Sequence, residues 1–197
     1  MKARIMRIAL CSFVLATTVA VPAFAQSSVD NPGAAAAKLQ KGEPAQNFRL
    51  PAVAGELSGE VELSEVNADG AVVVVVLRGY PGYQCPACSA QVADLIKHAD
   101  QFAAKNARVL LIYPGAKTQL AQHADEFLHG TKLPKPFTFL LDPGYEFTNA
   151  YGLRWDAPRE TAYPSTIVVD ESGKITFVKV SNSHRGRVSA TDVLAAL

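Results

Sequence analysis

The chain has 197 residues, of which 49% are hydrophobic and 19% charged, and its formal net charge is +1. Without the first 25 residues, 16 basic residues face 18 acidic ones, which gives a net charge of −2. This near-neutral balance gives no reason to expect a nucleic acid or an anionic membrane surface as partner, and the length fits one domain with one core.

Residues 1–25 have the features of a signal peptide. Three basic residues among the first seven precede the apolar stretch 8–21, and Ala23-Phe24-Ala25 satisfies the small-x-small rule for cleavage before Gln26. The apolar stretch is shorter than the ~20 residues of a membrane span and stops at Pro22. We therefore expect an exported protein, periplasmic or secreted, with no membrane attachment after cleavage.

Residues 26–41, with an Asn31-Pro32-Gly33 turn and an alanine run, are predicted to be a linker before a domain spanning 42–197. Alternating apolar and polar residues near 48–50 and 61–63 predict an N-terminal β extension. The five-valine run within 71–77 predicts a fully buried strand of a parallel sheet.

An amphipathic helix is predicted from Ser89 to about Lys105, because its apolar residues recur at steps of three and four. The remaining predicted elements are strands at 108–113, 137–141, 165–169 and 175–180, helices at 117–127 and 145–151, and a last helix capped by Ser189. The last two strands flank a turn at 171–173 and should form a hairpin. Strands that alternate with helices and end in a hairpin predict an α/β domain whose central mixed β-sheet is flanked by helices.

The sequence Cys85-Pro86-Ala87-Cys88 lies between the valine strand and the helix. Residues three apart on a first helical turn are neighbours, so the two sulfurs can reach disulfide distance without backbone movement. The amide groups at the helix N-terminus favour a thiolate at Cys85, and Pro86 suits the first helical position. We expect Cys85 to attack and the more covered Cys88 to resolve.

Two other interpretations of the cysteine pair are weaker. A structural zinc site needs four ligands, but no second CxxC exists and the four histidines lack ligand spacing. A purely structural disulfide between residues three apart closes a very small loop and stabilises little. We therefore expect redox chemistry, with no metal and no cofactor. Cleavage would also remove Cys11 and leave only this pair.

With these elements in place, the chain resembles the thioredoxin superfamily, and more narrowly its AhpC/TSA (redoxin) branch of peroxiredoxin-like and TlpA-like proteins. The resemblance rests on 42–48 (GEPAQNF), the strand–CPAC–helix block, Asp142 through Gly152, and 163–175 (YPSTIVVDESGKI). It implies a thioredoxin-like fold with the redox cysteine at a helix N-terminus. It also implies that Pro164 is a cis proline that lies against the CxxC and leaves the preceding backbone free to pair with a substrate.

Two activities remain open. The first is dithiol–disulfide exchange with protein or small thiols and disulfides. The second is an antioxidant thiol peroxidase, in which Cys85 attacks a peroxide and Cys88 resolves the sulfenic acid. Either requires an electron donor that the sequence does not identify. A non-catalytic binding module on the same fold is a third interpretation, although it has no need of two spaced thiols.

The peroxiredoxin signature P-x-x-x-T-x-x-C is absent, because Arg78 stands at its proline position and Gly82 at its threonine position. Arg78 could stabilise the thiolate or developing charge on a peroxide oxygen, or it could be a solvated loop residue. Arg159, Arg185 and Arg187 are weaker candidates for the same role.

Overall fold

The computed structural model describes residues 39–197. The predicted signal peptide and all but the last three residues of the predicted linker lie outside the described residues. The strands are β1 (Arg49–Gly55), β2 (Gly59–Glu62), β3 (Ala71–Val76), β4 (Ala107–Gly115), β5 (Phe137–Pro143), β6 (Ser165–Val169) and β7 (Ile175–Val180). The helices are α2 (Leu63–Asn67), α3 (Pro86–Lys97), α4 (Ala99–Ala104), α5 (Leu120–Leu128), α6 (Glu146–Ala150) and α7 (Ala190–Ala196).

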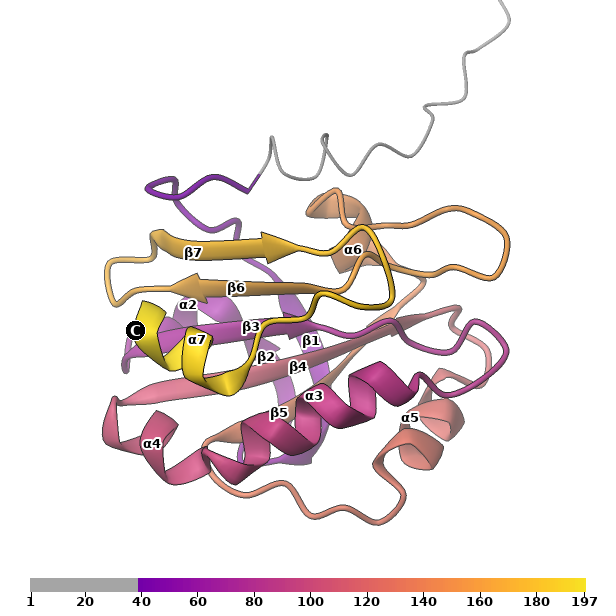
Figure 1. Ribbon diagram of the computed structural model, residues 1–197, viewed down its shortest axis with the longest axis horizontal. Helices are drawn as coiled ribbons and strands as arrows, with labels where there is room; N and C mark the ends of the chain where they lie inside the picture. Colours follow the sequence, from indigo (N-terminus) through magenta and orange to yellow (C-terminus); the bar gives the residue numbers. More distant parts are fainter. Residues whose placement is uncertain (1–38) are drawn as a thin grey trace, which may run out of the picture.

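The strands form one seven-stranded sheet in the order β2-β1-β5-β4-β3-β6-β7 (Figure 1). β3, β4 and β5 are parallel, whereas the outer pairings are antiparallel. The predicted α/β class, the mixed sheet, the β6–β7 hairpin and the N-terminal β extension are therefore confirmed.

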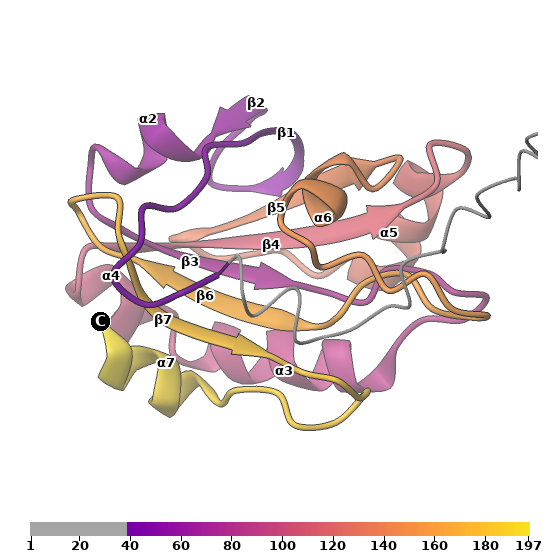
Figure 2. The same ribbon diagram turned by 90° about the horizontal axis from the view of Figure 1, so that it is seen from above.

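Helices cover both faces of the sheet (Figure 2). Alternate β3 residues point to opposite faces, so Val73 and Val75 pack with α3, α4, α5 and α7, and Val72 and Val74 pack with α2 and α6. The valine run is apolar at every position because both faces of β3 are buried. Both cysteines belong to the first of these two cores.

The helix expected from Ser89 to Lys105 starts earlier and is interrupted. α3 begins at Pro86, and His98 leaves helical geometry with φ −107° and ψ 17°, so that α4 begins at Ala99. The His98 ring nitrogen Nδ1 hydrogen-bonds the Asp94 carbonyl at 2.8 Å, which satisfies one of the acceptors that the helix end leaves free.

The loop between β3 and the cysteines is held close to the end of β4. Gly79 adopts φ +72°, and a Cβ at this position would lie 2.0 Å from the Pro114 carbonyl oxygen. A side chain there would meet both backbone strain and a collision, so glycine lets the loop pack down over the sheet. This close packing fixes where the chain enters α3.

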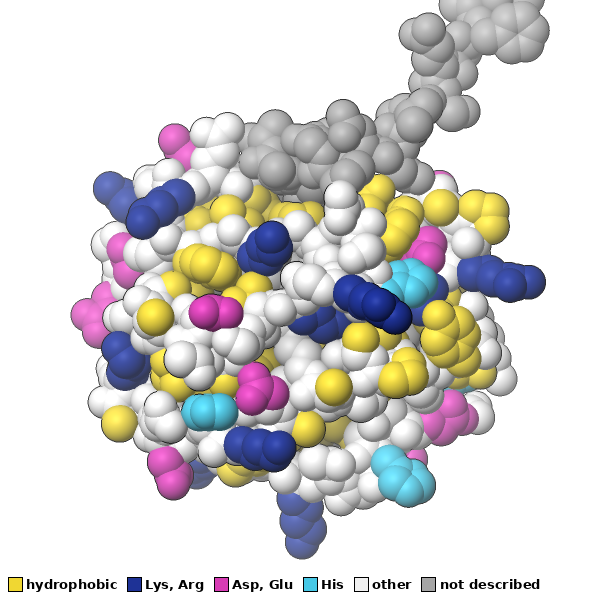
Figure 3. Space-filling view, in the orientation of Figure 1, with side chains coloured by type: hydrophobic (Ala, Val, Ile, Leu, Met, Phe, Trp, Pro, Cys, Tyr) yellow, Lys and Arg dark blue, Asp and Glu magenta, His cyan; other side chains and the backbone are white. Residues whose placement is uncertain are grey.

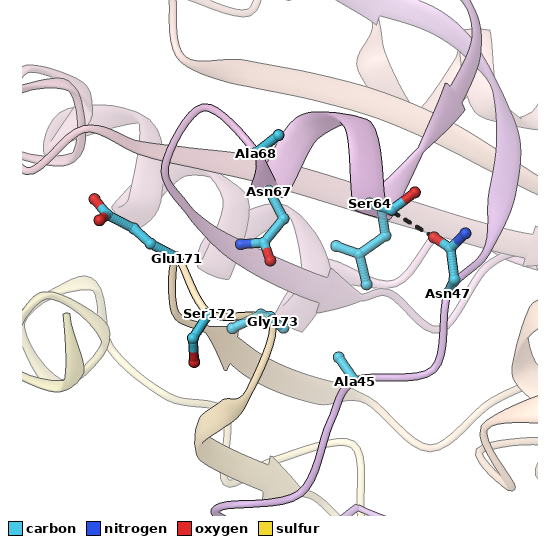
Figure 4. A pocket seen from close by; sticks show the side chains of 10 residues that line it. Ala45, Asn47, Ser64, Asn67, Ala68, Glu171, Ser172 and Gly173 are labelled. Atoms are coloured by element: carbon cyan, nitrogen blue, oxygen red, sulfur yellow. Dashed lines mark hydrogen bonds between the residues drawn. The ribbon is translucent and has the colours of Figure 1, made fainter.

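A cavity of about 240 Å³ lies between α2 and the β6–β7 turn, with Asn67 and Ser172 among its lining residues (Figure 4). Because Val169 at its rim pairs with Val72, the cavity lies at the N-terminal end of β3. The cysteines follow the C-terminal end of that strand, so this cavity is separate from them.

On the face shown in Figure 3, acidic and basic side chains are interspersed. Within residues 39–197, none of the helices combines the length and the apolar character that crossing a membrane requires.

Candidate active site

Cys85 is the N-cap of α3, with φ −82° and ψ 109°, and Pro86 occupies the first turn. The Cys88 backbone N–H donates to the Cys85 sulfur at 3.3 Å, as a capping side chain accepts from a free amide of the first turn. Both cysteines are free and buried, with 2% and 1% of their surfaces exposed. The structure thus places the pair at a helix N-terminus, as the sequence predicted.

The two cysteines have opposite acidities. A hydrogen bond from the Cys88 side chain, the Cys88 backbone N–H and the charges of Arg187 and Arg78 outweigh burial and lower the pKa of Cys85 to about 5. The same hydrogen bond to Cys85, together with burial, raises the pKa of Cys88. At neutral pH the reduced pair therefore holds a thiolate at Cys85 and a protonated thiol at Cys88.

Arg187 is the cation that contacts the sulfurs. Its Nη2 lies 3.5 Å from the Cys85 sulfur and 3.1 Å from the Cys88 sulfur. It comes from the segment between β7 and α7, where the Ser181 hydroxyl donates to the Ser183 and Arg185 carbonyls and closes a tight turn. The sequence named Arg187 only as a weaker candidate, because nothing local links it to Cys85.

The Arg78 side chain lies neither against the Cys85 sulfur nor in solvent, the two positions that the sequence suggested. Its side chain is 1% exposed and pairs with Glu160 at 3.0 Å, the Tyr83 hydroxyl at 2.6 Å and the Arg159 carbonyl at 2.7 Å. Only its backbone N–H contacts the pair, donating to the Cys88 sulfur at 3.3 Å. Arg78 is therefore neither solvated nor in contact with the Cys85 sulfur; it joins the loop before Cys85 to the loop before β6.

Glu160 extends this network toward the surface, because its second oxygen lies 2.8 Å from the Nε2 of His184, whose side chain is 41% exposed. The Thr161 hydroxyl donates to the Arg78 carbonyl. Sequence reasoning did not find Glu160, since a lone glutamate in an irregular segment gives no periodic signal. Within the described residues, no group of three metal-ligating side chains occurs.

The expectation that Pro164 is cis is wrong: the Tyr163–Pro164 bond is trans. The backbone expected to remain free for a substrate is already paired. The Tyr163 N–H donates to the Leu153 carbonyl, its carbonyl accepts from the Ser165 hydroxyl, and the Pro164 carbonyl accepts from the Ser181 N–H. Pro164 is buried beside Gln91 and Arg187, directly before β6, and its carbonyl holds the Ser181 N–H at the start of the turn that carries Arg187.

Gln91 is the other residue that sequence reasoning missed. Its side-chain carbonyl accepts from the Arg187 Nη1 at 3.1 Å, and its amide donates to the Thr166 hydroxyl at 3.4 Å. A detectable signal was present, because Gln91 lies three residues after Cys88 and interrupts the apolar face of the helix. Such a buried amide needs a hydrogen-bond partner.

Comparison with known proteins agrees with this fold. The sequence model of the Redoxin family matches residues 40–197, so the chain belongs to the Redoxin family. No curated protein sequence matches it significantly.

Several solved structures share the fold. Reduced 2-Cys peroxiredoxin of Plasmodium vivax is 21% identical with a TM-score of 0.62, over 79% of this chain and 92% of the other. Mycobacterium tuberculosis AhpC is 20% identical with a TM-score of 0.63, over 80% and 90% of the two chains. Peroxidoxin BcpB of the same organism is 20% identical with a TM-score of 0.60, over 80% and 96%. The protein is a Redoxin-family thiol redox protein with a thioredoxin-like, peroxiredoxin-type fold.

The low pKa of Cys85 predicts an unusual pH dependence for its reactivity. After reduction, the rate of Cys85 alkylation by iodoacetamide should be half-maximal near pH 5 and constant between pH 7 and 9, because the thiolate is then fully formed. An ordinary thiol would instead gain reactivity through about pH 8.5. Mass spectrometry of the peptide containing Cys85 measures the rate. A midpoint near 8.5 would contradict the site as described.

The two arginines should have different effects when replaced. Arg187→Met should raise the alkylation midpoint of Cys85 by about one pH unit, since an adjacent cation is removed. Arg78→Met should move the midpoint less, but it should lower the free energy of unfolding by about 3 kcal/mol because Glu160 loses its buried partner. Urea denaturation measures the stability. A larger midpoint shift for Arg78→Met would reverse this assignment.

Proposed function

We propose that this protein is a thiol–disulfide oxidoreductase in which Cys85 is the attacking thiolate and Cys88 the resolving thiol. The observation that carries the proposal is the division of acidity within one helical turn. Cys85 is ionised at neutral pH, while Cys88 keeps its proton within hydrogen-bonding distance of the Cys85 sulfur. Cys85 is thus ionised for nucleophilic attack, whereas Cys88 stays protonated until Cys85 has reacted.

The Cys85 thiolate attacks one sulfur of a substrate disulfide, whose S–S bond breaks and releases one substrate thiolate. The resulting mixed disulfide removes the negative charge at Cys85 that raised the pKa of Cys88. Cys88 then loses its proton more easily and attacks the Cys85 sulfur, which releases the second substrate thiol. The substrate gains two electrons, the pair becomes a disulfide, and a dithiol donor must reduce it for the next cycle.

Arg187 supports both steps from one position. Its Nη2 lies within 3.5 Å of each sulfur, so it can stabilise negative charge at Cys85 before the first attack and at Cys88 before the second. Arg78, which sequence analysis placed first for this role, also lowers the pKa of Cys85 through its charge, but its side chain hydrogen-bonds Glu160 and the Arg159 carbonyl.

A thiol peroxidase is the second candidate, and the burial of both sulfurs favours it. With 2% and 1% of their surfaces exposed, the cysteines are easier to reach for a small peroxide than for a protein disulfide. The Cys85 thiolate would break the O–O bond to give a sulfenic acid and a hydroxide or alkoxide ion, which takes up a proton. Cys88 would then form the disulfide and release water. Gly82, however, offers no hydroxyl where the peroxiredoxin signature has threonine.

A single assay with two arms tests the activity. Insulin disulfide reduction with dithiothreitol as donor should proceed faster than hydrogen peroxide consumption under the same conditions. Cys85→Ser should reduce both rates to background, whereas Cys88→Ser should accumulate a mixed disulfide with insulin that non-reducing mass spectrometry detects. Fast peroxide turnover with negligible insulin reduction would select the peroxidase. An inactive Cys88→Ser without adduct would contradict the assigned roles.

The proposal includes export of the protein. In an oxidising compartment the cysteine pair can act as a reductant only if a donor supplies electrons. The support is the sequence of residues 1–25 alone. When the gene is expressed in a bacterium, the protein in the periplasmic fraction should begin at Gln26. N-terminal sequencing tests this, and an intact N-terminus on cytoplasmic protein would contradict it.

A further inference from the structure

Gln91 is a polar residue in an apolar environment. It is 7% exposed and lies on the face of α3 that also buries Cys88, Val92 and Leu95. An apolar side chain would suit this face better, because a buried amide is costly unless its groups are paired. The two hydrogen bonds of Gln91 connect α3 to the Thr166 hydroxyl on β6 and to the Arg187 guanidinium.

The Arg187 guanidinium has few other partners. Nη2 contacts the two sulfurs, and Nε is buried without a hydrogen-bond partner among the described residues. Within residues 39–197, no carboxylate lies within ion-pair distance of Arg187. Apart from the cysteines, Gln91 is therefore the hydrogen-bonding partner that sets the direction of this side chain.

The neutral amide has a specific advantage at this position. A carboxylate would bind Arg187 more strongly, but it would also offset the positive charge that Cys85 experiences and repel the thiolate. The Gln91 amide oxygen orients the Arg187 guanidinium without adding a negative charge. The bond also does not depend on the redox state, so it can hold Arg187 in place after the thiolate has been consumed in a disulfide.

We propose that Gln91 is a positioning residue that holds the Arg187 guanidinium against both sulfurs without neutralising it. The proposal rests on the thiol chemistry of Cys85 proposed above, but not on whether the substrate is a disulfide or a peroxide.

The test measures the pH midpoint of Cys85 alkylation in the full chain. Gln91→Leu should raise the midpoint by about half a pH unit, which corresponds to the loss of one hydrogen bond. Gln91→Glu should raise it further, because its carboxylate competes with the thiolate for Arg187. Val92→Ala is the matched control: it disturbs packing on the same helix face without contacting Arg187, and should leave the midpoint unchanged.

A double-mutant cycle separates positioning from packing. In the Arg187→Met background, Gln91→Leu should no longer move the midpoint, because the cation that Gln91 directs is gone. An equal shift in both backgrounds, or no shift in folded Gln91→Leu, would overturn the proposal. Gln91→Met, of similar length and greater flexibility, provides the same comparison should Gln91→Leu not fold. The alkylation midpoint can be measured without turnover, so failure of the proposed function would appear separately, in the insulin and peroxide assay.

Discussion

The chemistry of this protein depends on one buried negative charge, the Cys85 thiolate at the N-terminus of α3. A buried anion is costly, so each neighbouring group must compensate for lost solvation. The Cys88 amide and thiol hydrogen-bond to it, and the Arg187 guanidinium approaches from the segment after β7. The hydrogen bond between the two cysteine side chains, together with burial, keeps Cys88 protonated, so the two thiols differ in acidity before any reaction.

The site has two arginines with distinct tasks. Arg187 contacts the sulfurs directly, whereas Arg78 ties together the loops on either side of the site through Glu160, Tyr83 and the Arg159 carbonyl. The Arg78–Glu160 pair, whose side chains are 1% and 12% exposed, costs desolvation of two charges and joins the loop that leads into α3 to the loop before β6. Arg187 therefore contacts the sulfurs, while the hydrogen bonds that hold the loop before Cys85 come from Arg78.

Much of the fold followed from local patterns. The valine run predicted a strand buried on both faces, the spacing of apolar residues predicted the helix after the cysteines, and the hairpin of β6 and β7 was visible from its turn. The break at His98 and the short helix α2 were not predicted, because each depends on a single residue or a single turn. The cis form of Pro164 was an expectation of the resemblance; the bond is trans, and the backbone around Tyr163 is paired within the chain.

The sequence by itself determined the reactive groups: two thiols one helical turn apart, behind a buried strand, with a proline that starts the helix. Those facts are local, because hydrogen bonds at a helix N-terminus involve neighbours along the chain. Only the tertiary structure decided which arginine lies beside the Cys85 sulfur. Arg187 lies 102 positions after Cys85, and no pattern in the sequence distinguishes it from Arg78, Arg159 or Arg185. Coulomb attraction acts through space, and folding alone brings β7, its following turn and Gln91 to the sulfurs.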